Sequence, residues 1–434
     1  MENFPLRDVV VVNPMIGLIP HIGSRRKNEY CRAWVTLHNK KTGGTSIRHA
    51  ASVWSGGDGF NLHVNSRFNC EDEVYTPHPR LFHPDSTLLG TELGTMSLLE
   101  YARNRSRRSI LRVYAEFELG VPWPCDNFDT RTWRTSQFCQ RECRCVLQTN
   151  LRAPREYILS QLGMKGADGL ANIALSPSPI DVSDHSDGES GAEFMAFKCN
   201  QDGMNPDAPA AHSAQCQDPV LKWRRVAELW FGDNESTGAN SSLVQGRLVS
   251  ALRDMQTRLL VLGCESAFDS RQVPIDIYRL AHSRPLLSAA RCPVDQSAHH
   301  MANDLLVRLA TACLGIENAS GLTRGHAAFD IIGRTDRLTT LYSVMMFALG
   351  EDNVMATRVL RHAAQVAAHP EAIDQSVSPA KLSSGEHAHD KLVQRFVTQL
   401  ADAVHAVSCR DKVLFQSAFG GRESPLERRF RDAS

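Results

Sequence analysis

The feature that most constrains the fold is the spacing of aliphatic residues in the second half of the chain. Apolar side chains recur there at steps of three and four residues, which is the period of a helix with one buried face. The clearest stripes run over 243–260, 301–314, 338–349 and 392–407. Consecutive amphipathic helices must pack against one another or against partner subunits. We therefore predict a helical domain over residues 220–434.

Helix ends in this half are marked by capping residues. Gly315 and Gly350 follow two of the apolar stripes and are expected to end those helices. Asp336 is expected to cap the helix over 338–349, and Asp352 to cap a further helix that ends before Pro370.

The first third of the chain has the pattern of strands. Apolar and polar residues alternate over 111–119, which predicts a strand with one buried face and one wet face that carries Tyr114 and Glu116. Residues 60–64 repeat the alternation after a glycine-rich turn, and 9–12 and 30–37 are further candidates. We predict a strand-containing N-terminal region over 1–175.

Residues 176–219 differ in composition from both flanking regions. They contain several prolines, few large apolar side chains, and these charged residues: Asp181, Asp184, Asp187, Glu189, Glu193, Lys198, Asp202, Asp207 and Asp218. Such a segment cannot bury enough apolar surface to offset its ordering entropy, so we predict an acidic loop or protruding insertion. The fold class predicted is α+β, predominantly α-helical, with this insertion between the two larger regions.

Composition excludes several classes of protein. Lys and Arg total 48 and Asp and Glu total 48, so the chain lacks the basic surplus of a whole-surface nucleic-acid binder. No apolar run is long enough to cross a membrane. The N-terminus lacks the pattern of an export signal, so the 12 cysteines are expected to be free thiols in a reducing compartment. The sequons at Asn104, Asn234, Asn240 and Asn318 are then chance matches.

No catalytic motif stands out. The nearest approach to a phosphate-binding loop is 41–45, Lys-Thr-Gly-Gly-Thr, but it lies between predicted strands, and Gly-Gly favours a hairpin turn. The 17 histidines and 12 cysteines permit many Cys/His pairings and single out none. We therefore expect no enzyme activity, no catalytic residues and no cofactor.

One cysteine cluster is a candidate metal site. Cys139, Cys143 and Cys145 lack the second short-spaced pair that structural zinc sites use, and one regular element cannot direct all three to one point. Free thiols are favoured over zinc, and no metal is predicted.

Arginine use is strongly biased. Nine of the 48 basic residues are lysine, which leaves 48 − 9 = 39 arginines. Guanidinium groups make bidentate contacts with phosphate or carboxylate and suit interfaces, although ordinary exposed arginines explain the bias as well. Trp123 and Trp133 lie nearby as candidate anchors. The candidate interface or RNA-facing residues are Arg103, Arg105, Arg107, Arg108 and Arg112.

By size and order of parts, the chain resembles the coat proteins of partitiviruses, small fungal double-stranded RNA viruses. The segments 243–260 and 336–349 are similar to shell helices, and 176–219 to a protruding arch. No residue-level motif carries the resemblance, so no functional residue is transferred. The strand-rich N-terminal third departs from the family's pattern.

The resemblance implies a structural subunit that self-assembles, through homodimers, into an icosahedral capsid around a double-stranded RNA genome. Its partners would be sister subunits, the packaged RNA and the viral polymerase, with no membrane, and its location the virion and the host cytoplasm. The alternatives are an intracellular Cys/His-dependent hydrolase, a secreted bacterial effector without a recognisable motif, and a monomeric scaffold built around the helical half.

Overall fold

The fold is α+β and predominantly α-helical, as the sequence predicted. The computed structural model describes residues 7–13, 31–39, 42–56, 60–64, 85, 97–105, 110–119, 130–175, 219–232, 240–264, 268, 304–316, 329–368 and 390–420. The predicted acidic insertion at 176–219 lies almost wholly outside these residues.

A six-stranded sheet forms the centre, in the order β1-β6-β5-β2-β4-β3. Five of the strands are mutually parallel, and β1 runs antiparallel to β6 at one edge. The strands are β1 (Val9–Val11), β2 (Cys31–Asn39), β3 (Phe60–Val64), β4 (Leu111–Leu119), β5 (Arg144–Leu151) and β6 (Ile331–Arg334). The strands predicted in the first third are confirmed, whereas β5 and β6 were not predicted. β6 comes from the region predicted as helical.

Helices surround the sheet. They are α1 (Gly44–Ser55), α3 (Leu98–Arg105), α4 (Thr130–Thr135), the π-helix η2 (Phe138–Glu142), α5 (Pro154–Leu175), α7 (Pro219–Phe231), α8 (Ser241–Leu252), α9 (Met255–Gly263), α12 (Leu305–Leu314), the 3-10 turn η5 (Thr335–Arg337), α13 (Leu338–Leu349), α14 (Asn353–Ala368), α16 (Lys391–Val407) and α17 (Cys409–Phe419). The predicted ends at Gly315 and Gly350 and the Asp352 cap of α14 are confirmed.

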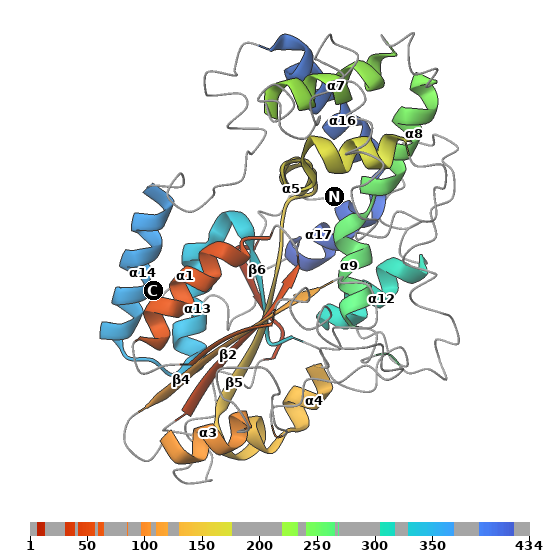
Figure 1. The fold of residues 1–434 in the computed structure, drawn as a ribbon. Coiled ribbons are helices and arrows are strands. Elements are labelled where there is room, and N and C mark those ends of the chain that lie inside the picture. The colour runs from red at the N-terminus through yellow and green to blue at the C-terminus, as the bar shows by residue number, and fades with distance from the viewer. Residues whose placement is uncertain are drawn as a thin grey trace, which may run out of the picture.

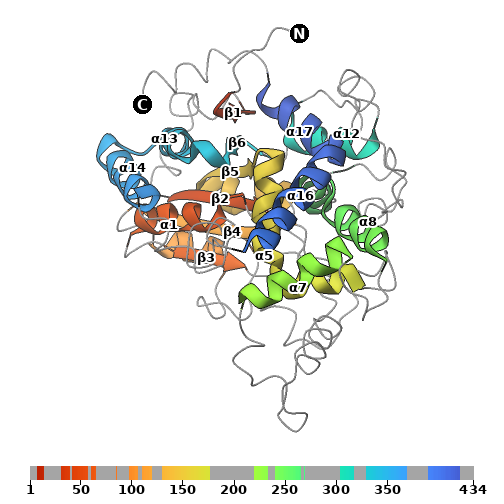
Figure 2. The same cartoon turned by 90° about the horizontal axis from the view of Figure 1, so that it is seen from above.

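The helices lie in two layers and one separate cluster. Helices α1, α13 and α14 pack on one face of the sheet, around Trp34 and Tyr114 (Figures 1 and 2). Helices α9, α12 and α17 pack on the opposite face, where Val35 and Leu147 point. Helices α5, α7, α8 and α16 enclose an apolar core of their own. Because helices cover both faces, the central strands are largely buried on both sides, and polar residues such as Thr36 and Gln148 are buried with the apolar ones.

The predicted wet face of β4 is wrong. Tyr114 and Glu116 are 1% and 0% exposed, because α1 covers that face and supplies a charged partner for the carboxylate. Alternation along a strand shows that one face is polar and the other apolar, but not which face is exposed to solvent. Here the polar face is buried beneath a helix.

The apolar stripe over 243–260 is divided between two helices. The chain breaks after α8 at Arg253 and Asp254, and Asp254 takes a left-handed conformation with φ of 51°. Its carboxylate accepts the backbone N–H of Arg410, at 2.9 Å, from a segment far away in sequence. The expected cap Asp336 is also wrong, because this residue lies in η5 and its carboxylate binds Arg334.

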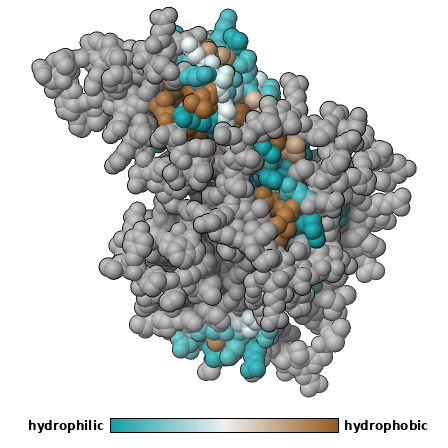
Figure 3. Space-filling model, turned by 90° about the vertical axis from the view of Figure 1, so that its right-hand side faces the viewer, coloured by the Kyte–Doolittle hydropathy of each residue, from teal (hydrophilic) through white to brown (hydrophobic). Residues whose placement is uncertain are grey.

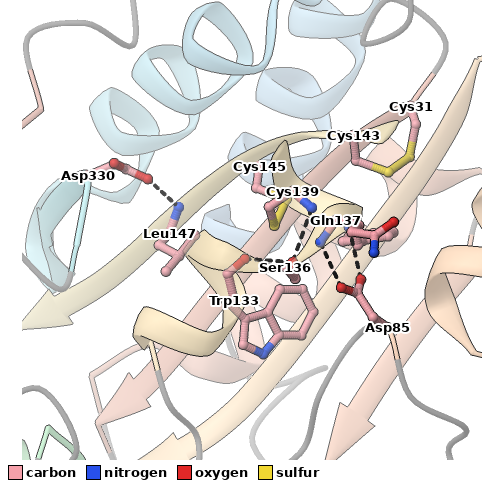
Figure 4. Close-up of a disulfide and its surroundings, with 11 residues drawn as sticks. Cys31, Asp85, Trp133, Ser136, Gln137, Cys139, Cys143, Cys145, Leu147 and Asp330 are labelled. Carbon is pink, nitrogen blue, oxygen red and sulfur yellow. Dashed lines mark hydrogen bonds between the residues drawn. A yellow bond between two sulfur atoms is a disulfide. The ribbon is translucent and has the colours of Figure 1, made fainter. Parts of the chain in front are cut away.

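The expectation of free thiols is wrong for the cysteines that the structure describes. Figure 4 shows the disulfides Cys31–Cys143 and Cys139–Cys145 beside the π-helix η2. A third disulfide, Cys264–Cys313, joins the end of α9 to α12. Their Cα separations of 4.4, 5.3 and 6.1 Å lie in the usual range for disulfides. Sequence spacing gave no sign that Cys31 would meet Cys143.

Candidate functional site

The loop that joins β2 to α1 is a strand-to-helix connection. The N–H of Thr42 donates to the carbonyl of Asn39 at 3.1 Å, and Gly43 then takes a left-handed conformation with φ of 92°. Helix α1 begins at the next residue, Gly44. The predicted hairpin turn is therefore wrong. Because β2 pairs in parallel with both β4 and β5, its chain must cross over through a helix.

This loop lies where the strand order of the sheet reverses. The chain that leaves β2 passes through α1 to β3, on the β4 side of the sheet, whereas the chain that leaves β5 goes on to β6, on the other side. β2 and β5 are neighbours. In open α/β sheets, ligands bind outside the carboxyl ends of the strands at such a switch point. Figure 2 shows α1 and α5 leaving this edge on different sides of β2.

A chain of buried polar side chains holds the loop against the sheet. The Gln148 amide accepts a hydrogen bond from Thr36, at 3.0 Å, and donates to Asn150, at 2.6 Å. Asn150 in turn donates to the carbonyl of Thr42, at 3.1 Å. All four residues are buried. Buried polar groups that are fully hydrogen-bonded specify one arrangement, so the loop is fixed before any ligand arrives.

The first turn of α1 has the character of an anion-binding surface. No side chain caps this helix, and no acidic residue occupies its first turn. The N–H groups of Gly44, Thr45 and Ser46 have no acceptor within the helix, and the helix dipole places partial positive charge there. In this turn Thr45 is exposed and Ser46 is half-buried.

Beneath this turn lies a charged cluster of His38, Glu116 and Arg48. The Arg48 guanidinium donates to both carboxylate oxygens of Glu116, at 2.9 and 3.1 Å. Nδ1 of His38 lies 3.2 Å from Oε1 of Glu116, an ion-pair separation outside hydrogen-bond geometry. Burial alone would raise the pKa of Glu116, but the contacts from His38 and Arg48 outweigh it and lower the pKa to about 2. Glu116 is therefore ionised.

The imidazole of His38 also explains why position 44 is glycine. A Cβ at Gly44 would overlap the His38 ring, so only glycine allows the helix to begin this close to the strand. Tyr114 completes the cluster by donating its hydroxyl to Glu116 at 3.1 Å. Burial and the Glu116 charge raise the pKa of Tyr114, so the phenol stays a donor.

The neighbouring strand ends bring further charged groups to the same edge. Arg152 follows β5, and burial lowers its pKa although Glu156 and Asp336 act in the opposite direction. Thr335 follows β6 and links the loops, since its hydroxyl donates to the carbonyl of Leu151 at 3.2 Å. Its methyl carbon lies 3.4 Å from where a Cβ at Gly43 would be.

The candidate arginines from the sequence do not form one surface in the described residues. Arg103 is exposed on α3 and pairs with Glu142 at 3.1 Å. Arg112 is partly buried on β4 and makes a bidentate contact with Glu351, at 2.9 Å for both bonds. The side chain of Arg105 and all of Arg107 and Arg108 lie outside the described residues, as does Trp123.

The other candidate residues have structural surroundings. Trp133 is fully buried against Phe138. Cys139, Cys143 and Cys145 are all paired in disulfides. In the parts of the chain that the structure describes, no cluster of metal-ligating side chains was found.

The loop 41–45 was predicted to be a hairpin turn, and the site residues His38, Glu116 and Arg152 were not predicted. The available signal was the order of features: an apolar run, two lysines (Lys40 and Lys41), two glycines and then a helical period. The two lysines lie outside the described residues.

Comparison with protein families, curated proteins and solved structures finds no match to this chain. Among the described helices, none is both long and apolar enough to cross a membrane. The site must therefore be interpreted from its own geometry.

Proposed function

We propose that this protein binds a phosphate-bearing small molecule of the nucleotide class at the β2–α1 loop. The observation that carries the proposal is the position of that loop. It opens an uncapped helix directly after a central parallel strand, at the point where the strand order reverses. Helix N-termini at such positions bind phosphate through backbone N–H groups.

Three features support an anionic ligand of the nucleotide class. Gly43 turns the chain in a left-handed conformation, and glycine at position 44 lets the helix begin against the His38 ring, so the helix starts directly at the strand end. The loop is held in place by buried hydrogen bonds, which removes the cost of ordering it on binding. Arg152, at the end of the neighbouring strand, supplies a guanidinium for a second anionic group.

The test is a binding measurement on the full chain. Isothermal titration calorimetry with ATP, adenosine 3′,5′-bisphosphate, NAD and inorganic phosphate compares ligands with differently placed phosphates. We expect at least one nucleotide to bind more tightly than inorganic phosphate. Gly44→Ala should weaken that binding by about tenfold or more, since it displaces either the helix start or His38.

Matched variants separate binding from folding. Gly246→Ala is the control, because a Cβ there meets open space on α8. Arg152→Ala should weaken the binding of nucleotides that carry phosphates at two positions more than it weakens the binding of inorganic phosphate. If no probe binds the wild-type chain, or if Gly44→Ala binds all of them normally, the proposal is wrong.

The disulfides indicate the kind of cellular compartment in which the chain folds. Disulfides are rare in cytosolic proteins and typical of secreted proteins and of the secretory lumen. In place of the host cytoplasm, we propose that the chain folds in an oxidising compartment. Mass spectrometry of the alkylated, unreduced protein should leave Cys31, Cys139, Cys143 and Cys145 unlabelled. Full labelling of these four would refute this placement.

The coat-protein hypothesis stays a prediction. The exposed large apolar side chains in the described residues are Ile110, Leu243, Phe347 and Val354. On the face drawn in Figure 3, hydrophobic and hydrophilic described residues are interspersed. Size-exclusion chromatography distinguishes the two functions, because a capsid elutes as a megadalton particle and a small-molecule binder as a 48.1 kDa chain or small oligomer.

A further inference from the structure

Three described connections between the sheet and the helical cluster meet at one place. The helical cluster, which consists of α5, α7, α8 and α16, lies at the top of Figure 1 with the sheet below it. The chain enters the cluster from β5 through residues 152–153. It leaves from α8 to α9 at Arg253 and Asp254, and from α16 to α17 at Ser408. A movement of the cluster relative to the sheet must therefore involve these connections.

Side chains of the three connections bind one another's backbone. The Gln256 amide, at the start of α9, accepts the N–H of Arg152 at 2.8 Å and donates to its carbonyl at 3.2 Å. The Ser408 hydroxyl accepts the N–H of Asp254 at 3.3 Å. The Asp254 carboxylate accepts the N–H of Arg410 at 2.9 Å. The connections thus form one junction, made of residues 152, 253–257 and 408–411.

Asp411, in the first turn of α17, is buried within this junction and is 1% exposed. Its carboxylate accepts the N–H and the hydroxyl of Thr257, at 2.8 and 2.7 Å, and the N–H of Gln256, at 3.3 Å. All three donors belong to the first turn of α9. Asp411 therefore ties α17 to the residues at which the chain leaves the helical cluster.

Helix α9 is shared between two apolar cores. Met255 and Leu259 pack in the core of the cluster, whereas Leu260 and Val261 pack in the core on one face of the sheet. The helix begins after Asp254, which is the one non-glycine residue with a positive φ in the described parts of the chain. Such conformations persist where surrounding contacts hold them. Loss of the junction contacts would therefore change how α9 packs against both cores.

Cationic partners at the junction are directed at Asp254 and Asp304. Arg253 donates to Asp254 at 3.1 Å, and Arg410 donates to both carboxylate oxygens of Asp304, at 3.1 and 2.8 Å. Burial and the nearby Asp254 charge raise the pKa of Asp411 to about 7. Ionisation of Asp411 adds a second buried negative charge beside Asp254, and opening of the junction would hydrate that charge. The charged and titratable groups on the surrounding elements are Arg152, Arg253, Asp254, Arg258, Asp304, His405, Arg410 and Lys412.

We propose that this junction is a pH-sensitive switch, which is closed while Asp411 carries a proton and loosens when Asp411 ionises, so that the helical cluster moves relative to the sheet. The proton is released to solvent, and no covalent bond forms or breaks. This switch is independent of ligand binding at the β2–α1 loop. In the open junction Asp411 is hydrated and has an ordinary pKa of about 4, so opening becomes more favourable as pH rises from about 4 to 7.

Hydrogen exchange on the full chain tests the switch, provided that it is resolved to single amides and corrected for the intrinsic pH dependence of exchange. The reporter amides donate to side chains across the junction: Arg152, Asp254, Gln256, Thr257 and Arg410. We expect their opening constant to rise by about tenfold per pH unit between about pH 4.5 and pH 6.5. Amides inside β2 and α16 should stay protected, because both cores remain folded. An opening constant that is independent of pH, or one shared with the β2 amides, would overturn the proposal.

Asp411→Asn removes the titrating group at nearly constant side-chain size and should abolish the pH dependence of the opening constant. The matched control is Asp402→Asn, which removes an exposed carboxylate from α16 and should keep the wild-type pH dependence. If Asp411→Asn retains that dependence, another group controls opening and the proposal is wrong.

A second variant covers the case in which Asp411→Asn does not fold. Asp254→Asn keeps an oxygen for the N–H of Arg410 and removes the charge that helps to raise the pKa of Asp411. Its opening constant should therefore stop rising at a lower pH than in the wild type. Identical pH profiles for Asp254→Asn and the wild type would contradict the proposed coupling between the two carboxyls.

Discussion

Two junctions in this molecule each bury a carboxylate completely, and they treat it in opposite ways. At the β2–α1 junction, Glu116 meets Arg48 and His38, and its pKa falls to about 2 although burial alone would raise it. At the junction of α9 with α17, burial and the nearby Asp254 charge raise the pKa of Asp411 to about 7. Burial raises the pKa of both carboxyls, but only Glu116 has cationic partners whose contacts outweigh it.

The donors around Asp411 show why it differs. The N–H and the hydroxyl of Thr257 donate to one carboxylate oxygen, at 2.8 and 2.7 Å, and the N–H of Gln256 donates to the other, at 3.3 Å. These donors are neutral, and Arg410 lies against Asp254 and Asp304 instead. The first junction therefore holds a charge next to the proposed ligand site, whereas the second holds, within a structural contact, a carboxyl whose pKa is raised.

The largest expected effect comes from removing the positive partner. Arg48→Met should destabilise the fold by about 3 kcal/mol near neutral pH, because it removes both arginine hydrogen bonds from a buried, ionised carboxylate. The loss should shrink toward acid pH as Glu116 becomes protonated. Urea unfolding at several pH values measures it.

The matched control is Arg155→Met, which breaks the exposed pair with Asp402 and should cost less than about 1 kcal/mol. An equal cost for the two variants would mean that the Glu116 pair behaves as a surface ion pair.

The second effect is a pH dependence of opposite sign at the two carboxylates. Because the folded pKa of Asp411 is raised, the folded state holds a proton that the unfolded state loses, so its contribution to stability falls as pH rises from about 4 to 7. Glu116 has a lowered folded pKa, so its contribution is present above about pH 4.5 and is lost as pH falls toward 2.

Asp411→Asn removes the first titration. Relative to wild type, the unfolding free energy of this variant should improve by on the order of 2 kcal/mol between pH 4 and pH 7. A constant difference between the two proteins over that range would show that Asp411 titrates normally.

The smallest effect compares one hydroxyl at each junction. Tyr114→Phe removes a donor from Glu116 and leaves the Arg48 contacts in place, so we expect a loss of about 1 kcal/mol and little change in the charge state. Thr257→Val should cost a similar amount and should raise the pKa of Asp411 further, since that donor lowers it. If the unfolding free energies of the two variants changed with pH in the same way, the two carboxylates would not differ as described.

Local sequence patterns predicted many of the helices and strands correctly, but they did not predict what packs against them. Periodicity located β4 and the helices α12 to α16, because each element's own residues encode it. The burial of Glu116 could not be predicted, since its partner Arg48 is 68 positions away. The Gly43–Gly44 pair fits both a hairpin and a strand-to-helix turn, and only the parallel pairing of β2 decides between them.

The position of β6 has a consequence for synthesis of the chain. β5 ends at Leu151, and its outer edge is covered by β6, which begins at Ile331. At ordinary rates of translation, the residues between them take roughly 10 to 40 seconds to emerge. During that interval the nascent sheet has an unpaired edge that can bind other strands. A chaperone that shields exposed strand edges would therefore matter most between completion of β5 and arrival of β6.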